Sequence, residues 1–82
     1  MDDAEVIRRI NELADEEHRL EQAAGHGPDA LSEADHDRLR QVEVALDQCW
    51  DLLRQRRARR ASGQDPDDAE VRSEGTVEGY QQ

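Results

Sequence analysis

Apolar residues recur at intervals of three and four along the first part of the chain, at Val6, Ile10, Leu13 and Leu20. This spacing places them on one face of an α-helix, because 3.6 residues make one turn. The stretch GHGP (25–28) ends the pattern, since glycine permits a left-handed cap and proline cannot continue the helix. The hydrophobic pattern therefore predicts a helix over residues 3–24.

A second run with the same spacing follows. Ser32 and Asp35 have the arrangement of a capping box, in which each side chain bonds the backbone amide of the other residue at the start of a helix. Ser62 and Gly63 mark the end of the run. We expect a helix over about 32–61, whose seam is formed by Leu39, Val42, Leu46, Cys49 and Leu53.

The short connection between these helices favours an antiparallel arrangement of the two. The predicted fold class is therefore all-α, with residues 1–63 forming a coiled-coil-like two-helix hairpin. Residues 64–82 are acidic and show no sustained period, so we expect them to be largely disordered or loosely docked. The tail residues that could still contact the hairpin are Val71, Val77 and Tyr80.

A hairpin has one seam and buries little apolar surface, so a further partner is expected to cover it. The heptad register places Trp50 opposite Ile7 on one flank, while Leu52 lies on the other flank. A second hairpin would cover this wide surface as a homodimeric four-helix bundle; a folded-back tail is the alternative. The predicted association face contains Ile7, Cys49, Trp50, Leu52 and Leu53, with Cys49 interpreted as a small seam residue.

Five arginines, which we call the arginine cluster, fall in the last turns of the second helix: Arg54, Arg56, Arg57, Arg59 and Arg60. Cations suit a helix C-terminus, and the hairpin brings them beside Asp2, Asp3 and Glu5 at the start of the first helix. This structural role is the favoured interpretation. The alternatives are a contact patch for an acidic protein partner and, with less support, a nucleic-acid accessory role.

Carboxylates and imidazoles at helical spacing raise a second functional hypothesis. Such groups, projecting into a four-helix bundle, form di-iron carboxylate sites. Glu17 is unusual because it occupies an a position in an otherwise apolar seam. The alternative function is therefore a metal-binding bundle, and the other interpretation is a solvated set of ion pairs in which Arg38 or Arg40 neutralises Glu17. The candidate ligands are Glu17, His18, Glu21, Glu33 and His36.

The composition of the chain narrows the functional classes to which the protein could belong. The net charge of −10 argues against a general nucleic-acid or anionic-membrane binder, because phosphate contacts need positive charge. The single cysteine and the lack of a signal peptide or membrane-spanning run favour a cytoplasmic location. No phosphate-binding loop, catalytic triad or paired-cysteine motif is present, so we expect no enzymatic activity and no cofactor.

The segments DDAEVIRRINELADEEHRL, LDQCWDLLRQRRA and VEGYQ resemble a family of short actinobacterial proteins catalogued as a domain of unknown function. The resemblance covers nearly the whole chain and implies a helical, cytoplasmic, non-secreted protein. It carries over no functional residues. The sequence as a whole predicts a non-enzymatic, self-associating module for protein–protein interaction or regulation.

Overall fold

The computed structural model describes residues 1–25, 27 and 31–79, and within them it contains helices and no strands. Helix α1 covers Asp3–Ala24 and helix α2 covers Glu33–Ala61. A 3-10 turn, η1 (Pro66–Asp68), and a short helix, α3 (Glu74–Gly79), follow them. The described chain is therefore mostly helical, and both long helices have the predicted bounds.

Helix α1 has a polar cap at each end. The side chain of Asp2 accepts a hydrogen bond from the amide of Glu5 at 2.8 Å, which satisfies one of the free amides of the first turn. At the other end Gly25 donates to carbonyls of the last turn but has a right-handed backbone (φ −67°). The helix ends at the GHGP stretch as predicted, and the glycine of that stretch with a positive φ, of 130°, is Gly27.

Helix α2 begins with the predicted capping box. The amide of Asp35 donates to Ser32 Oγ at 3.1 Å, and the amide of Ser32 donates to Asp35 Oδ2 at 3.4 Å. The helix ends at the predicted place, where the amide of Ser62 still bonds helical carbonyls. Gly63 then takes a left-handed conformation (φ 75°), which turns the chain out of the helix.

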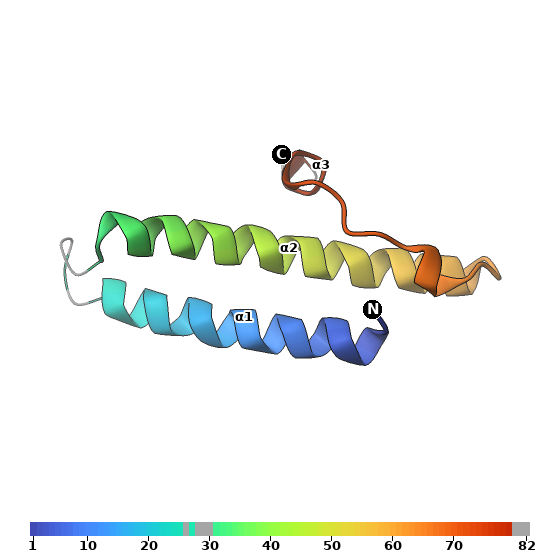
Figure 1. Ribbon diagram of the computed structural model, residues 1–82, viewed down its shortest axis with the longest axis horizontal. Helices are drawn as coiled ribbons and strands as arrows, with labels where there is room; N and C mark the ends of the chain where they lie inside the picture. Colours follow the sequence, from blue (N-terminus) through green and yellow to red (C-terminus); the bar gives the residue numbers. More distant parts are fainter. Residues whose placement is uncertain (26, 28–30, 80–82) are drawn as a thin grey trace.

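Helices α1 and α2 lie side by side and run in opposite directions (Figure 1). After α2 the chain turns back, and residues 64–79, which we call the tail segment, follow α2 toward its middle. Both η1 and α3 pack on α2, and in the described part of the chain neither packs on α1. No helix among the described residues has the length and apolar character needed to cross a membrane.

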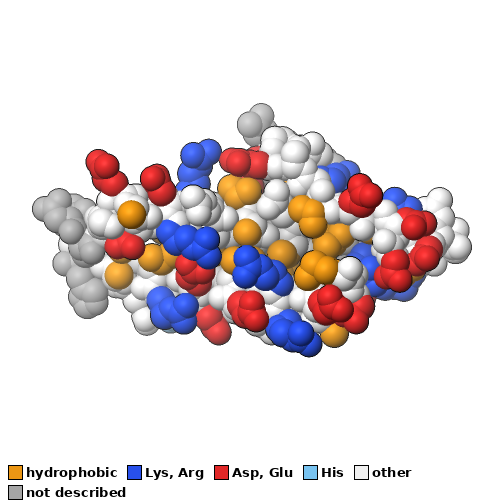
Figure 2. Space-filling model, in the orientation of Figure 1, with side chains coloured by type: hydrophobic (Ala, Val, Ile, Leu, Met, Phe, Trp, Pro, Cys, Tyr) orange, Lys and Arg blue, Asp and Glu red, His pale blue; other side chains and the backbone are white. Residues whose placement is uncertain are grey.

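The core lies between the two long helices, as the seam pattern predicts. Val6 and Ile10 of α1 pack against Leu52 and Leu53 of α2, and Ala69 of the tail segment covers the same cluster. Figure 2 shows apolar side chains along the junction of the two helices, bordered by charged groups of both signs. The remaining buried or partly buried apolar residues of this seam are Leu13, Leu20, Leu39, Val42, Leu46 and Cys49.

Candidate interaction surface

The predicted association face divides into a buried and an exposed part. Leu52 and Leu53 are 5% and 3% exposed, so they belong to the core and are not available on the surface. The heptad pattern predicted Leu52 on an uncovered flank. In the structure Ala69 of the tail segment packs against the core cluster that contains Leu52, which the pattern could not predict. Cys49 is partly buried against the same cluster, and burial raises the pKa of its thiol. It is a seam residue, as interpreted from the sequence.

Ile7 and Trp50 form the exposed part. The side chain of Trp50 is 50% exposed and that of Ile7 is 48% exposed, although both belong to long helices. Leu53 and Cys49 beside Trp50 face α1, whereas the tail segment lies on another side of α2. Neither packing surface therefore buries the largest apolar side chain of the described residues.

The arginine cluster separates into groups that face different neighbours. Arg56 is 5% exposed; its Nε donates to Asp3 Oδ1 at 2.5 Å and its Nη1 donates to Asp67 Oδ1 at 3.0 Å and to the carbonyl of Pro66 at 3.1 Å. Arg60 Nη2 donates to Asp3 Oδ2 at 2.7 Å. Arg56 therefore joins the start of α1 and the turn η1 to α2, and the predicted pairing of arginines with the start of α1 holds for Asp3.

These guanidinium groups change the acidity of their partner. Hydrogen bonds from Arg60 and then Arg56 lower the pKa of Asp3 to about 2, because they stabilise the ionised carboxylate. The pKa of Arg56 is raised by its bonds to Asp3 and Asp67. The remaining members of the arginine cluster do not share this ion-pair group. Arg54 and Arg59 line an open cleft beside the tail segment, and Arg57 is exposed.

Three polar residues of α2, spaced by three and four, hold the tail segment. Gln48 Nε2 donates to the carbonyl of Arg72 at 3.1 Å, and Gln55 Nε2 donates to the carbonyl of Glu70 at 2.7 Å. Between them Asp51, which is 1% exposed, accepts from Arg72 Nε at 3.0 Å and from Gln55 Nε2 at 2.9 Å. These residues were not singled out from the sequence, where the only signal is a polar stripe along α2.

The described tail segment also makes an apolar contact and carries one buried polar atom without a hydrogen-bond partner. Val77 is 2% exposed, whereas Val71 is 58% exposed, and Tyr80 lies outside the described residues. Next to Val77, an Oε atom of Glu78 is buried without a hydrogen-bond partner. The proximity of Asp47, together with burial, raises the pKa of Glu78, so this carboxyl group holds its proton more readily than an exposed glutamate does.

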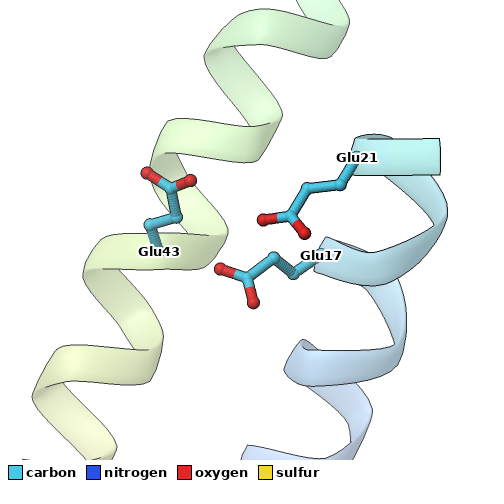
Figure 3. A group of neighbouring side chains, drawn as sticks. All are labelled: Glu17, Glu21 and Glu43. Atoms are coloured by element: carbon cyan, nitrogen blue, oxygen red, sulfur yellow. The ribbon is translucent and has the colours of Figure 1, made fainter. Parts of the chain in front are cut away.

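Of the five predicted metal ligands, only Glu17 and Glu21 come together among the described residues. Glu17 and Glu21 of α1 lie with Glu43 of α2, and the three carboxylates point toward one another (Figure 3). We call this group the Glu17 cluster. Within the described residues no such group includes a histidine, and the remaining candidates, His18, Glu33 and His36, are exposed. The geometry does not support the di-iron-like site, which needs imidazoles and carboxylates on the same inner face.

The Glu17 cluster is a site of repulsion. Burial, followed by the charges of Glu21, Glu43 and Asp47, raises the pKa of Glu17. The sequence interpretation that Arg38 or Arg40 neutralises Glu17 is wrong. Arg38 instead donates to Glu16 through Nε at 2.5 Å and through Nη2 at 2.6 Å.

Arg40 also has another partner, since its Nη2 lies 3.3 Å from Oε1 of Glu74 in α3. Both arginines are exposed on α2, where Arg38 pairs with Glu16 of α1 and Arg40 pairs with Glu74 of α3. The seam carboxylate of Glu17 therefore has no ion-pair partner among the described residues.

Comparison with known proteins gives one family. A family model described as "Protein of unknown function (DUF2630)" matches residues 2–82. Uncharacterized proteins from Mycobacterium bovis and Mycobacterium tuberculosis are 49% identical over 78 residues, which is 95% of this chain and 88% of each relative. No solved structure matches the chain. These relatives are actinobacterial and confirm the resemblance found in the sequence.

Proposed function

Since the chain belongs to the DUF2630 family, whose function is unknown, we propose from its geometry that it is a non-enzymatic helical module that binds a second copy of itself. The contact would lie on the flank of α2 around Trp50, with Ile7 of α1 beside it. The product would be a homodimer in which two pairs of long helices form a four-helix bundle.

The observation that carries this proposal is the half-exposed side chain of Trp50. Tryptophan is the residue most often found as an energetic anchor at protein interfaces, because its large ring excludes much water when it is covered. The heptad pattern of the sequence predicts that Ile7 lies on the same flank, and its side chain is also half exposed. Together they offer an apolar centre that this chain leaves uncovered.

The charges around Trp50 favour a second copy as the occupant. Glu43 precedes Trp50 by seven residues and Arg57 follows it by seven, and both are exposed on the same flank of α2. If two α2 helices cross antiparallel about a two-fold axis at Trp50, Glu43 of each copy meets Arg57 of the other. The flank is therefore self-complementary in charge, as a two-fold interface requires.

The test is native mass spectrometry of the protein at micromolar concentration, together with sedimentation equilibrium. We expect a dimer for the unmodified chain. Trp50→Ala should weaken dimerisation by about thirtyfold, as loss of an interface anchor does. Val71→Ala serves as the matched control, because Val71 is an exposed apolar residue outside the proposed face, and it should leave the dimer unchanged.

A charge swap tests the orientation of the two copies. Arg57→Glu and Glu43→Arg should each weaken the dimer, and the double variant should recover it, because the exchanged charges again pair across the axis. A monomer for the unmodified chain would contradict the proposal. A dimer that both Trp50→Ala and Arg57→Glu leave intact would also contradict it.

A further inference from the structure

An open cleft of about 630 Å³ lies between the last turns of α2 and the tail segment. One wall is a stripe of α2 residues and the other is formed by residues that follow the helix. The volume falls in the range of small-molecule sites in proteins. The residues that line it are Asp51, Arg54, Gln55, Ala58, Arg59, Ser62, Gln64 and Arg72.

The cleft is positively charged although the whole chain is strongly acidic. Its lining contains three arginines and one aspartate. Asp51 is matched by Arg72, whose Nε lies 3.0 Å from Asp51 Oδ2. Arg54 and Arg59 have no ion-pair partner within the described residues, and the acidic side chains of the neighbouring tail segment, from Asp65 to Glu70, do not line the cleft. Two positive charges are therefore left uncompensated there.

The walls of the cleft are held in place by interactions that do not use the side chains of these two arginines. Gln55 bonds the carbonyl of Glu70 at 2.7 Å, and Asp51 fixes the Arg72 side chain. At the end of α2 the Ser62 hydroxyl donates to the carbonyl of Ala58 at 3.0 Å. The backbone amide of Gln64 donates to the carbonyl of Arg59 at 2.7 Å. The helix carbonyls, whose partial negative charge would oppose an anion, are thus partly satisfied.

We propose that this cleft, with Arg54 and Arg59 as its principal contacts, binds a small anionic molecule through a phosphate or carboxylate group. A guanidinium group presents a planar set of donors that matches both kinds of oxyanion. The amide of the Gln64 side chain provides a further donor at the same wall. This binding function is separate from the self-association flank, because neither Trp50 nor Ile7 lines the cleft.

The net charge of the chain favours a small ligand over a polyanion. A nucleic acid or a long acidic peptide would extend beyond the cleft and meet the field of a protein with a net charge of −10. A small anion inside the cleft meets a lining that includes Arg54 and Arg59, and at physiological ionic strength the more distant acidic groups are screened. The arrangement therefore selects for size as well as for charge.

Isothermal titration calorimetry with pyrophosphate and with citrate, at constant ionic strength, tests the proposal on the full chain. We expect one of these probes to bind, and the one that binds more tightly identifies the ligand class as phosphate or polycarboxylate. Arg54→Gln and Arg59→Gln should each weaken that binding about tenfold, which is the effect of one charge-assisted hydrogen bond. Arg19→Gln, which removes the same charge from an exposed site on α1, should leave it unchanged.

Chemical-shift mapping locates the bound probe, with perturbations expected for the amides of Arg59, Ser62 and Gln64. The absence of binding for both probes would overturn the proposal. An equal loss of affinity in Arg19→Gln would also overturn it, because attraction would then depend on total charge alone. Circular dichroism of each variant confirms that the helices are retained, so that a loss of binding is not a loss of fold.

Discussion

Asp51 and Arg72, which are 21 residues apart, form an ion pair in which Arg72 Nε lies 3.0 Å from Asp51 Oδ2. Asp51 is almost completely buried, and Gln55 provides a second hydrogen bond to the same oxygen. A buried carboxylate is tolerated only when charged or polar donors replace the lost water. The pair therefore couples the tail segment to the middle of α2.

Breaking this pair should release the tail segment and destabilise the chain. Arg72→Ala leaves the Asp51 carboxylate buried with Gln55 alone, and we expect a loss of about 1–3 kcal/mol in the free energy of unfolding. The estimate is below that for a fully buried pair because the Arg72 side chain is 40% exposed. Chemical denaturation measures the change, and limited proteolysis within 64–79 reports on the release.

Asp37→Ala is the matched control for this prediction. Asp37 is exposed on the same helix and forms no ion pair with the described part of the tail segment, so its removal should change the free energy of unfolding by less than about 0.5 kcal/mol. If Arg72→Ala and Asp37→Ala have the same stability and the same proteolysis rate, the ion pair does not hold the tail segment.

The sequence predicts the two long helices well because local signals define them. The spacing of apolar residues, the capping box at Ser32 and the left-handed Gly63 each act within a few residues, and the structure has the helices where these signals lie. The burial of Leu52 could not be predicted in this way. Its cover includes Ala69, a small residue in a segment without periodicity.

The position of the tail segment could not be predicted from the sequence either, because its contacts with α2 include backbone groups. Gln48 and Gln55 bind the backbone carbonyls of residues 72 and 70, respectively, and every residue type has such a carbonyl.

The metal hypothesis fails because helical spacing alone does not determine which carboxylates approach across the seam. Glu43, which the sequence did not select, is the residue that meets Glu17.

Acid should weaken the junction between α1 and α2 at Asp3. The pKa of this carboxyl is lowered from 3.8 to about 2 by Arg60 and Arg56, so the folded chain binds fewer protons than the unfolded chain between these values. The resulting stabilisation is complete above about pH 4 and is lost as the pH falls through about 2.

The Asp3→Asn variant should therefore unfold at a lower temperature than the unmodified chain at pH 7, and the difference should shrink toward pH 2. An NMR titration that follows the side-chain carboxyl carbon of Asp3 measures the pKa of this group directly. Asp15→Asn, at an exposed position of the same helix, provides the control. A midpoint for Asp3 near 3.8 would show that the arginines do not stabilise its ionised form.

The Glu17 cluster should have the opposite pH dependence. The pKa of Glu17 is raised above the ordinary glutamate value of 4.5, so the folded chain binds the Glu17 proton more tightly than the unfolded chain does. The free energy of unfolding therefore falls as the pH rises from 4.5 through the raised pKa of Glu17. Glu17→Gln removes a like-charge pair with Glu21 at four residues' spacing and a repulsion across the seam from Glu43. We expect a gain of about 0.5–1 kcal/mol at pH 7 and no gain below pH 4. Thermal unfolding at both pH values checks this, and a Glu17→Gln variant less stable at pH 7 would contradict it.

Docking of α3 should also weaken as the pH rises, through the neighbouring carboxyls of Glu78 and Asp47. Proximity to Asp47, burial and the charge of Glu74 raise the pKa of Glu78, and Arg40 only partly offsets them. A protonated Glu78 can share its proton with Asp47, whereas two ionised carboxylates repel each other. Above the raised pKa of Glu78 this repulsion pushes α3 away from α2.

Hydrogen exchange of the Val77 amide, which bonds the carbonyl of Ser73 at 3.0 Å, reports this docking directly. After correction for the intrinsic exchange rate, its protection should fall as the pH rises through the Glu78 titration. In the Glu78→Gln variant the protection of the Val77 amide should stay constant, because the glutamine side chain is neutral at every pH. Asp68→Asn, an exposed change in the same tail segment, should behave like the unmodified chain. Protection that falls equally in Glu78→Gln would place the pH dependence at another group.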